Sequence, residues 1–417
     1  MLIMKNKFIV LLLLTIIIGG AAVVVKANSA TSVQGIIVSD ITWTKENSPY
    51  ILTGNMVIDN NVTLTIEPGV TVNLNKFYIR INGTLVARGS NTDNIHLNAE
   101  TSGYIEFTAS SIGWNSQFGA GGIIENAVIN ARLDIGAGSP TINNNTITKR
   151  ISIGEGSPII SKNRIAIVTI GNDPYSGTNA IGTSNGSKAI IIDNEISGSF
   201  TTATIVIGGS PTIQRNRISN SYGYGGSAGY GQAGIFIYSN ACPTIRQNTI
   251  TKNANGISLV DGNSMPIIVY NNIEDNFNYN LFINLGIQVD IDAANNWWGT
   301  TDTSVIERKI HDFNDNFDLG KVNYIPFLTS PNPNAMPDPN ALIPTPDTSP
   351  SSSSPTTTNL PSDSQNPTTP MDQTDTQSGF NLSEIGLFAV AGIIIALLIV
   401  NIFFMKRRRT ISKVSQA

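Results

Sequence analysis

The chain has 417 residues, of which only 13% are charged, and its formal net charge is −4. This acidic balance excludes general binding to nucleic acid, because such binding relies on basic patches. The single cysteine, Cys242, excludes a disulfide within the chain, and we expect it to be a small buried residue.

The first 27 residues have the features of a secretory signal peptide. Two lysines precede an apolar run from Phe8 to Ile18, and small residues follow it up to Ala27. This order of charged, apolar and small residues predicts cleavage after Ala27 and export of the rest of the chain. The apolar run can also be read as continuing to Val25, so an uncleaved N-terminal anchor is the alternative.

Residues 28–110 are predicted to form an N-terminal cap and the first coils of a strand-and-turn structure. Apolar and polar residues alternate from Ile51 to Leu74, around one Glu-Pro-Gly turn. Such alternation between turn residues predicts short strands. The first coil of a stack has an open edge that must be covered. We therefore assign residues 31–60 to the cap, which contains Trp43 and Tyr50.

Residues 111–329 carry an internal repeat. One phrase, Ser-Pro-Thr-Ile-x-x-Asn-x-Ile or a close variant, recurs six times between Ser139 and Ile273, at intervals of 18 to 32 residues. Its asparagines are Asn145, Asn163, Asn194, Asn216, Asn248 and Asn271. An isoleucine lies three residues before and two residues after each of them. Repeats of this length with β-branched residues predict stacked coils of short strands, which is a solenoid.

The repeat phrase resembles that of right-handed parallel β-helix repeat proteins, the pectate-lyase-like solenoid superfamily that includes archaeal and bacterial cell-surface proteins. The resemblance implies an all-β, right-handed parallel β-helix. We expect the isoleucines to fill the interior of the stack. Each repeated Asn is expected to adopt a left-handed backbone at the bend and to bond its copy in the next coil.

The sequence NNWWGT at 295–300 and the segment 320–331 resemble the terminal coil of the same family. We expect Trp297 and Trp298 to cap the Ile stack, with a sugar-stacking platform as the alternative. Between the two segments, residues 312–318 read Asp-Phe-Asn-Asp-Asn-Phe-Asp, and their side-chain oxygens resemble those of a calcium loop. The Gly and the bidentate Glu of such a loop are missing. We therefore predict no metal or other cofactor, with calcium here as the alternative.

The last part of the chain predicts a stalk and a membrane anchor. Residues 330–383 are rich in Pro, Ser and Thr and contain no Lys or Arg, which is typical of a disordered stalk. Residues 384–405 contain an apolar run long enough for a transmembrane helix, and the tail 406–417 begins with four basic residues. This order predicts a single-pass protein of the cell membrane, with an extracellular body and a cytoplasmic tail.

Equivalent positions of stacked coils form columns, and two columns beside the repeated Asn are charged. The residues directly before the Asn include Lys162, Asp193 and Arg215, and those directly after it include Arg164, Glu195 and Arg217. In each column an acidic residue lies between two basic ones. One interpretation is a pair of surface salt-bridge ladders, which add little stability. The other is a polar groove for an acidic sugar chain, with Lys or Arg holding its carboxylates.

Insertions with aromatic residues follow the repeated Asn of the same three coils. They leave from one side of consecutive coils, so we expect them to project together. Solenoids commonly place such insertions on a binding face, and rings on Gly-rich loops suit contact with sugars or proteins. The alternative is that these loops are only mobile insertions. The aromatic residues are Tyr175, Phe200, Tyr222, Tyr224 and Tyr230.

The sequence favours binding over catalysis. The paired Asp-Asp and Gly-His-Gly segments that pectin hydrolases of this architecture share are absent, and both histidines lie outside the repeats. We expect a non-catalytic protein that binds extracellular glycans or surface proteins through the face at residues 162–232. The alternative is a polysaccharide lyase or glycoside hydrolase acting on acidic polysaccharide. Its candidate catalytic residues are Asp193, Glu195, Arg215 and Arg217.

Overall fold

The computed structural model describes residues 29–100, 102–167, 179–199, 203–221, 233–284 and 286–344. The predicted signal peptide, the transmembrane run, the basic tail and most of the stalk lie outside the described residues. The same is true of Tyr175, Phe200, Tyr222, Tyr224 and Tyr230. In the described ranges, no helix combines the length and the apolar character needed to cross a bilayer.

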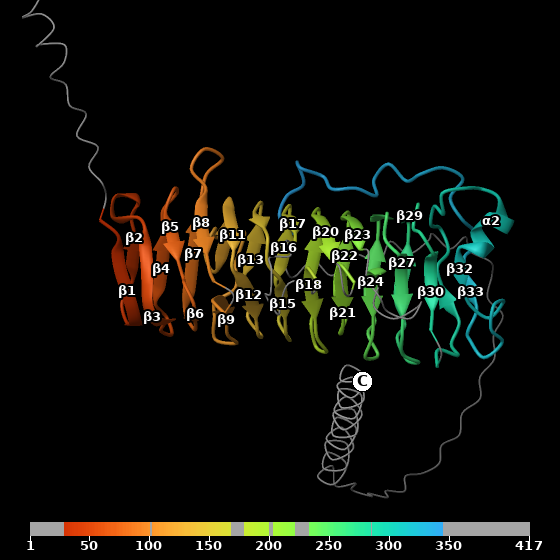
Figure 1. Cartoon of the computed structure of the whole chain (residues 1–417), viewed down its shortest axis with the longest axis horizontal. Coiled ribbons are helices and arrows are strands. Elements are labelled where there is room, and N and C mark those ends of the chain that lie inside the picture. The colour runs from red at the N-terminus through yellow and green to blue at the C-terminus, as the bar shows by residue number, and fades with distance from the viewer. Residues whose placement is uncertain are drawn as a thin grey trace, which may run out of the picture. The chain divides into compact units, whose positions relative to one another are not determined.

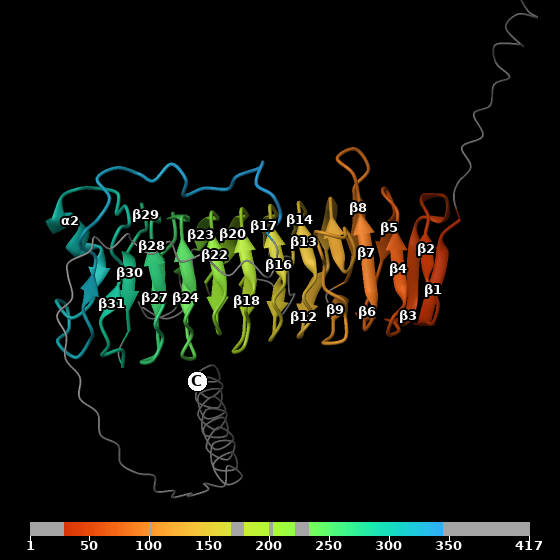
Figure 2. The same cartoon turned by 180° about the vertical axis from the view of Figure 1, so that it is seen from behind.

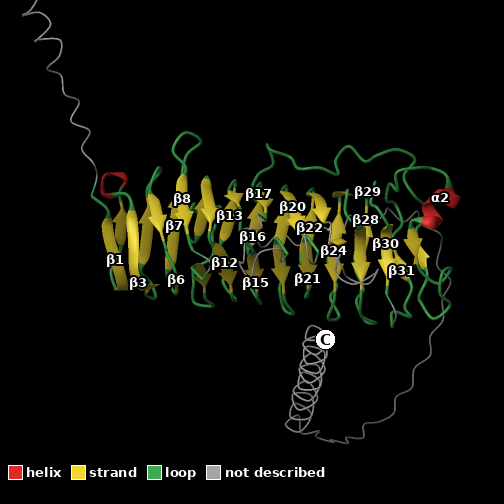
Figure 3. Cartoon of the chain, in the orientation of Figure 1, coloured by secondary structure: helices red, strands yellow, loops and turns green. Residues whose placement is uncertain are grey.

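Short parallel strands stack coil upon coil along one axis, in three columns (Figures 1 and 3). The first column leads up to the repeated Asn and consists of β2 (Ile41–Trp43), β4 (Thr63–Ile66), β7 (Thr84–Arg88), β10 (Ile123–Glu125), β13 (Thr141–Asn143), β16 (Ile159–Ser161), β19 (Ile190–Ile192), β22 (Thr212–Gln214), β25 (Thr244–Arg246) and β28 (Ile267–Val269). The second column follows the Asn and consists of β5 (Thr71–Asn73), β8 (Ile95–Asn98), β11 (Ala127–Asn130), β14 (Thr146–Ile147), β17 (Arg164–Ala166), β20 (Glu195–Ser199), β23 (Arg217–Ser221), β26 (Thr249–Thr251) and β29 (Asn272–Glu274).

The third column completes each coil. It consists of β6 (Tyr78–Ile81), β9 (Tyr104–Phe107), β12 (Arg132–Ile135), β15 (Ile151–Ile153), β18 (Ile181–Thr183), β21 (Ile205–Ile207), β24 (Ala233–Ile237), β27 (Asn255–Leu259), β30 (Tyr279–Ile283) and β32 (Ile310–His311). In the first coils, β1 (Thr31–Ile37) pairs with β3 (Tyr50–Ile58), and β3 pairs with both β5 and β6. Outside the columns lie the 3₁₀ turn η1 (Lys45–Asn47), the helix α2 (Thr303–Arg308) and the pair β31 (Ile291–Asp292) and β33 (Val322–Asn323).

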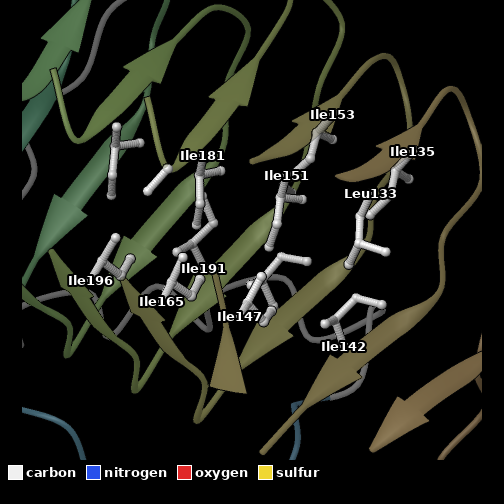
Figure 4. Close-up of a cluster of buried hydrophobic side chains, with 14 of the residues drawn as sticks. Leu133, Ile135, Ile142, Ile147, Ile151, Ile153, Ile165, Ile181, Ile191 and Ile196 are labelled. Atoms are coloured by element: carbon white, nitrogen blue, oxygen red, sulfur yellow. The ribbon is translucent and has the colours of Figure 1, made fainter. Parts of the chain in front are cut away.

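A stack of aliphatic side chains fills the interior, as the sequence predicts (Figure 4). In the third column Leu133, Ile151 and Ile181 lie in register on successive coils, and all three are fully buried. In the first column Ile142 aligns with Ile160, which aligns with Ile191. Burying one such side chain stabilises the fold by roughly 1.5–3 kcal/mol. The stack is therefore the main source of stability in a chain without disulfides.

The repeated asparagines form a continuous buried ladder. Nδ2 of each Asn donates to Oδ1 of the next at 2.9 to 3.0 Å, and the same Oδ1 accepts the backbone N–H of the preceding Asn. This confirms the expected bond between copies. The ladder also has a rung that the repeat phrase does not include, because Asn271 donates to Asn296 of the terminal coil at 3.0 Å.

The left-handed backbone at the bend belongs to a different residue from the one expected. The positive φ angles, between 50° and 59°, lie at the residue directly before each ladder Asn of the repeat, which is Asn144, Lys162, Asp193, Arg215, Gln247 or Tyr270. The prediction for the repeated Asn itself is therefore wrong. The reason is that its amide must turn inward to donate and accept between coils, whereas the preceding side chain projects outward and varies freely.

Aromatic side chains cover both ends of the interior. At the first coil the buried rings of Trp43 and Tyr50 stack with centroids 4.6 Å apart. At the other end Trp297 and Trp298 are buried, and the Trp297 Nε1–H donates to Glu274 at 2.8 Å. Aromatic rings are thus buried at both ends of the stack, where the sequence predicts caps. The prediction that Cys242 is buried is wrong, because its side chain is exposed. Cys242 points outward, directly before the buried Pro243 of the repeat phrase.

Candidate functional site

The two charged columns lie at the bend between the first and second strand columns. Lys162, Asp193 and Arg215 each occupy the left-handed position of the bend. Arg164, Glu195 and Arg217 are the first residues of β17, β20 and β23, and they align in register. The structure thus brings all six residues together on three successive coils.

Asp193 and Arg215 form a tight ion pair. The Arg215 guanidinium donates from Nε and Nη2 to the two carboxylate oxygens at 2.7 and 2.8 Å. This hydrogen bonding raises the pKa of Arg215 above its ordinary value, against the desolvation that lowers it. Asp193 Oδ1 also accepts the backbone N–H of Asp338 at 2.9 Å. The Asp193 carboxylate is buried and engaged on both oxygens, which does not suit a catalytic acid or base.

The other charged column is open to solvent. Arg164, Glu195 and Arg217 are exposed, and within the described residues they form no ion pair with one another. The predicted salt-bridge ladder is therefore wrong for this column. In the column directly before the repeated Asn, only Asp193 and Arg215 form the predicted ion pair. Side chains without partners in the exposed column remain available to a ligand.

Residues 330–344, which the sequence places at the start of a projecting stalk, instead run back along the coils. We call this segment the strap; it is the blue trace of Figures 1 and 2. Lys162 Nζ donates to the carbonyl of Pro339 at 3.1 Å. A hollow of about 360 Å³ remains between strap and coils, with Pro337 on one side and Arg164 and Glu195 on the other. The strap thus covers part of the predicted ligand groove.

The calcium-like loop uses its own oxygens. Asp312 is buried, and its carboxylate accepts the backbone N–H groups of Asn314 at 2.9 Å and Val322 at 2.8 Å. These bonds tie the loop to β33. Across the described ranges, no three His, Cys, Asp or Glu side chains are grouped so that they could hold a metal ion.

A second hollow, of about 290 Å³, lies on the outer face of the third strand column. Ser152 of β15 and Gly182 of β18 occupy the outward position on successive coils and form its floor. Asp134 continues this row toward the N-terminal coils, and Val206 continues it the other way. Tyr238 adds an aromatic side chain to the lining.

Ion pairs and stacked rings border this hollow on the N-terminal side. Arg132 binds Asp134 through Nη2 at 2.8 Å, and its guanidinium lies 4.7 Å from the centroid of the Tyr104 ring. Glu106 lies one coil before Asp134 and forms an ion pair at 2.8 Å with Arg80 of the preceding coil. The hydrogen bond to Glu106 raises the pKa of Arg80. Burial raises the pKa of Tyr104. Both lining carboxylates are therefore neutralised by an arginine.

Two buried donors without partners belong to Arg150, which lines the same hollow, and to Asn179, which lies beside Gly182 of its floor. Arg150 Nε and Asn179 Nδ2 are buried and make no hydrogen bond to the described part of the chain. A methyl group on Gly182 would lie 2.6 Å from Asn179 Nδ2 and 3.0 Å from Arg150 Nη2. The Asn179 amide and the Arg150 guanidinium therefore meet above one glycine, Asn179 through its unpartnered Nδ2 and Arg150 through Nη2. Unsatisfied buried donors are rare in native proteins, and they point to an acceptor that is supplied from outside the chain.

Sequence reasoning missed this hollow because it aligned only the positions beside the repeated Asn. The second apolar run of each coil has its own outward column, which a parallel alignment would have shown. Its members change from charged through small to aromatic, in the order Asp134, Ser152, Gly182, Val206 and Phe236.

Replacing Asp193 by Asn tests whether this carboxylate is structural. Asn keeps the shape and tolerates the left-handed backbone, but it removes the charge that holds Arg215. We expect the free energy of unfolding to fall by about 2 kcal/mol, as when a charged hydrogen bond is lost. Urea unfolding of the full chain measures it. Glu195→Gln, on the same coil but exposed, is the control, and an equal loss in both variants would contradict a structural role.

Comparison with known proteins agrees with this architecture. Residues 131–298 match the family model described as right handed beta helix region. The comparisons with curated proteins and with solved structures returned no match. The matched stretch contains the ladder from Asn145 to Asn296 and the strands from β12 to β31. Residues 131–298 are therefore a right-handed β-helix region, and the same parallel coils continue before it.

Proposed function

We propose that this chain is a membrane-anchored cell-surface protein that binds acidic glycans without cleaving them, through the hollow on the third strand column. One observation carries the proposal: the Arg150 guanidinium and the Asn179 amide meet above Gly182, and each contains a buried donor without a partner. A carboxylate or hydroxyl oxygen of a sugar would accept from both, and a charge-assisted bond from Arg would be the stronger of the two.

The rest of the lining suits a sugar. Ser152 offers a hydroxyl group that can donate and accept, and the Ser184 hydroxyl, which donates to the carbonyl of Ile153, can still accept. Tyr238 lies beside Phe236, with ring centroids 6.4 Å apart, at the edge of the hollow. Aromatic faces provide apolar contact area for the C–H surfaces of a sugar ring, while the polar groups fix its orientation.

Binding has more support than cleavage, because three of the four carboxylates that line the two hollows are paired, and only Glu195 is not. Glu106 and Asp134 are held by Arg80 and Arg132, and Asp193 is held by Arg215. Glycoside hydrolysis uses one carboxylic acid that keeps its proton and one free carboxylate across the same bond. The arginines occupy oxygens of all three groups, which opposes both roles.

The location is proposed from the order of segments in the sequence. A signal-like leader precedes the solenoid, and an apolar run with a basic flank follows it. This arrangement supports a body outside the cell and a single anchor at its C-terminal side.

Binding of charged oligosaccharides to the full chain in detergent micelles tests the proposal. We expect saturable binding of oligosaccharides that carry carboxylates, and weaker binding of neutral ones of the same length. Arg150→Ala should lower the affinity by about tenfold or more, the loss that one charge-assisted hydrogen bond implies. Isothermal titration calorimetry measures both.

Matched variants and a product assay complete this test. Gly182→Ala should also weaken binding, because the added methyl group occupies the space between the two donors. Arg308→Ala, exposed on α2, should change nothing. Equal affinity for the wild type and Arg150→Ala would place the site elsewhere. Release of reducing ends or of unsaturated products would overturn the non-catalytic part of the proposal.

A further inference from the structure

The strap contacts the coils mainly through its main chain. Asn332 donates its backbone N–H to Oδ1 of Asn272 at 2.7 Å, and its carbonyl accepts from Nδ2 of the same residue at 3.0 Å. One amide side chain thus pairs with the strap as a neighbouring strand would. Farther along, Thr249 Oγ1 donates to the carbonyl of Ala335. The bonds from Asp338 to Asp193 and from Lys162 to Pro339 complete the series.

The spacing of these contacts matches the rise of the solenoid. Ala335 lies at β26 and Asp338 lies two coils earlier, at the bend before β20. Three residues of polyproline chain advance about 9 Å, and two coils spaced like neighbouring strands rise by about the same distance. The strap turns on either side of this step, because the Ala335 N–H donates to the Asn332 carbonyl at 3.1 Å and the Ala341 N–H donates to the Asp338 carbonyl at 3.3 Å. Four prolines limit its conformations because their φ angles are fixed. They are Pro331, Pro333, Pro337 and Pro339.

Three strap residues add selectivity to the main-chain contacts. The Asn332 side chain donates to the carbonyl of Tyr270 at 2.6 Å. Ala335 is fully buried, so a larger side chain would not fit without moving the strap. The Asp338 carboxylate contributes to the raised pKa of Arg215, which places negative charge beside that guanidinium. The surface therefore suits the order Asn, Ala and Asp among prolines.

We propose that this surface is a binding site for a proline-rich peptide, and that the strap is its tethered occupant. We call the surface the track; it consists of Lys162, Asp193, Thr249, Tyr270 and Asn272. The track lies at the bend and second strand column, so the proposal is independent of the glycan site on the third column. It assigns Lys162 and Asp193 to peptide recognition, where the sequence suggested a sugar or a catalytic role.

A hinge allows the strap to leave the track. Leu328 is fixed to the terminal coil, because its N–H donates to the carbonyl of Asn296 at 3.0 Å. The next three residues, 329–331, are exposed. Rotation there frees the strap without disturbing the coils. The vacated groups then accept an equivalent segment, and the strap of a neighbouring copy is the nearest such peptide.

A labelled peptide with the sequence of residues 330–342 tests the proposal. The protein is the full chain in micelles, with residues 330–342 replaced by a Gly/Ser run of equal length. We expect saturable binding of the peptide, followed by fluorescence anisotropy. The wild-type chain should bind the peptide at least about tenfold more weakly, because its own strap competes at a local concentration in the millimolar range.

Two further variants distinguish specific binding of the peptide to the track from nonspecific adsorption to the protein surface. Asn272→Ala in the strap-replaced chain should lower the affinity about tenfold, because it removes two hydrogen bonds to the peptide main chain. Peptide with Ala335 replaced by Trp should fail to bind. If strap replacement disturbs folding, the full chain with Asn332→Ala and Asp338→Ala replaces it, and it should bind the peptide better than wild type. Equal binding to all chains, or none up to roughly 1 mM, would overturn the proposal.

Discussion

Asn194→Ala is expected to lower the free energy of unfolding by about 4 to 5 kcal/mol, because it leaves several buried polar groups unpaired. Asn194 is fully buried. Its Oδ1 accepts from the backbone and the side chain of Asn163, and its Nδ2 donates to Asn216 and to the carbonyl of Ile160. Alanine removes all of these bonds, and no water can reach the middle of the stack to replace them.

Urea unfolding of the full chain, followed by circular dichroism, measures this loss. Asn60→Ala makes the same chemical change at an exposed turn and should alter stability by less than about 0.5 kcal/mol. A small effect of Asn194→Ala would show that the ladder follows from the coil geometry without supporting it.

The second large effect is expected for Ile191→Ala, at about 3 to 4 kcal/mol, the usual range for truncation of a fully buried aliphatic side chain. Ile191 is 0% exposed and lies in register between Ile160 and Ile213 on the neighbouring coils. The parallel ladders hold those coils at a fixed separation, so the cavity cannot close by collapse.

Thermal and urea unfolding of Ile191→Ala test this expectation, with Ile267→Ala as the matched control. Ile267 belongs to the same strand column, but its side chain is 56% exposed. Its truncation should change the free energy of unfolding by less than about 0.5 kcal/mol. Equal losses at the two positions would mean that the buried column does not dominate stability.

The coil structure is predictable from the sequence because its two main interactions join identical residues. A ladder amide must face another amide one coil away, and a core isoleucine must face another isoleucine. Asn163, Asn194 and Asn216 therefore repeat in the sequence at the intervals at which they stack. The left-handed residue before them leaves no such trace, because Lys162, Asp193 and Arg215 share only a backbone conformation.

The second hollow and the strap are hard to predict for physical reasons. The hollow exists because the outward residues on its floor, Gly182 and Ser152, are small. Small residues also occur in every turn of such a chain, so they do not mark a hollow in the sequence. The strap is bound through backbone groups, as in the bond from Lys162 to the carbonyl of Pro339. Its composition is that of an unfolded segment, and composition does not report where an extended chain can lie.

The direction of the strap determines how the protein responds to tension from its C-terminal side. A pull beyond Leu342 loads the contact at Lys162 first, then the one at Asp193, and only afterwards those at Thr249 and Asn272. The contacts break one after another, as in peeling, so little force is needed for each. The freed chain of residues 330–342 then lengthens the tether by up to about 40 Å. Force therefore reaches the β-helix only after the released segment is fully extended.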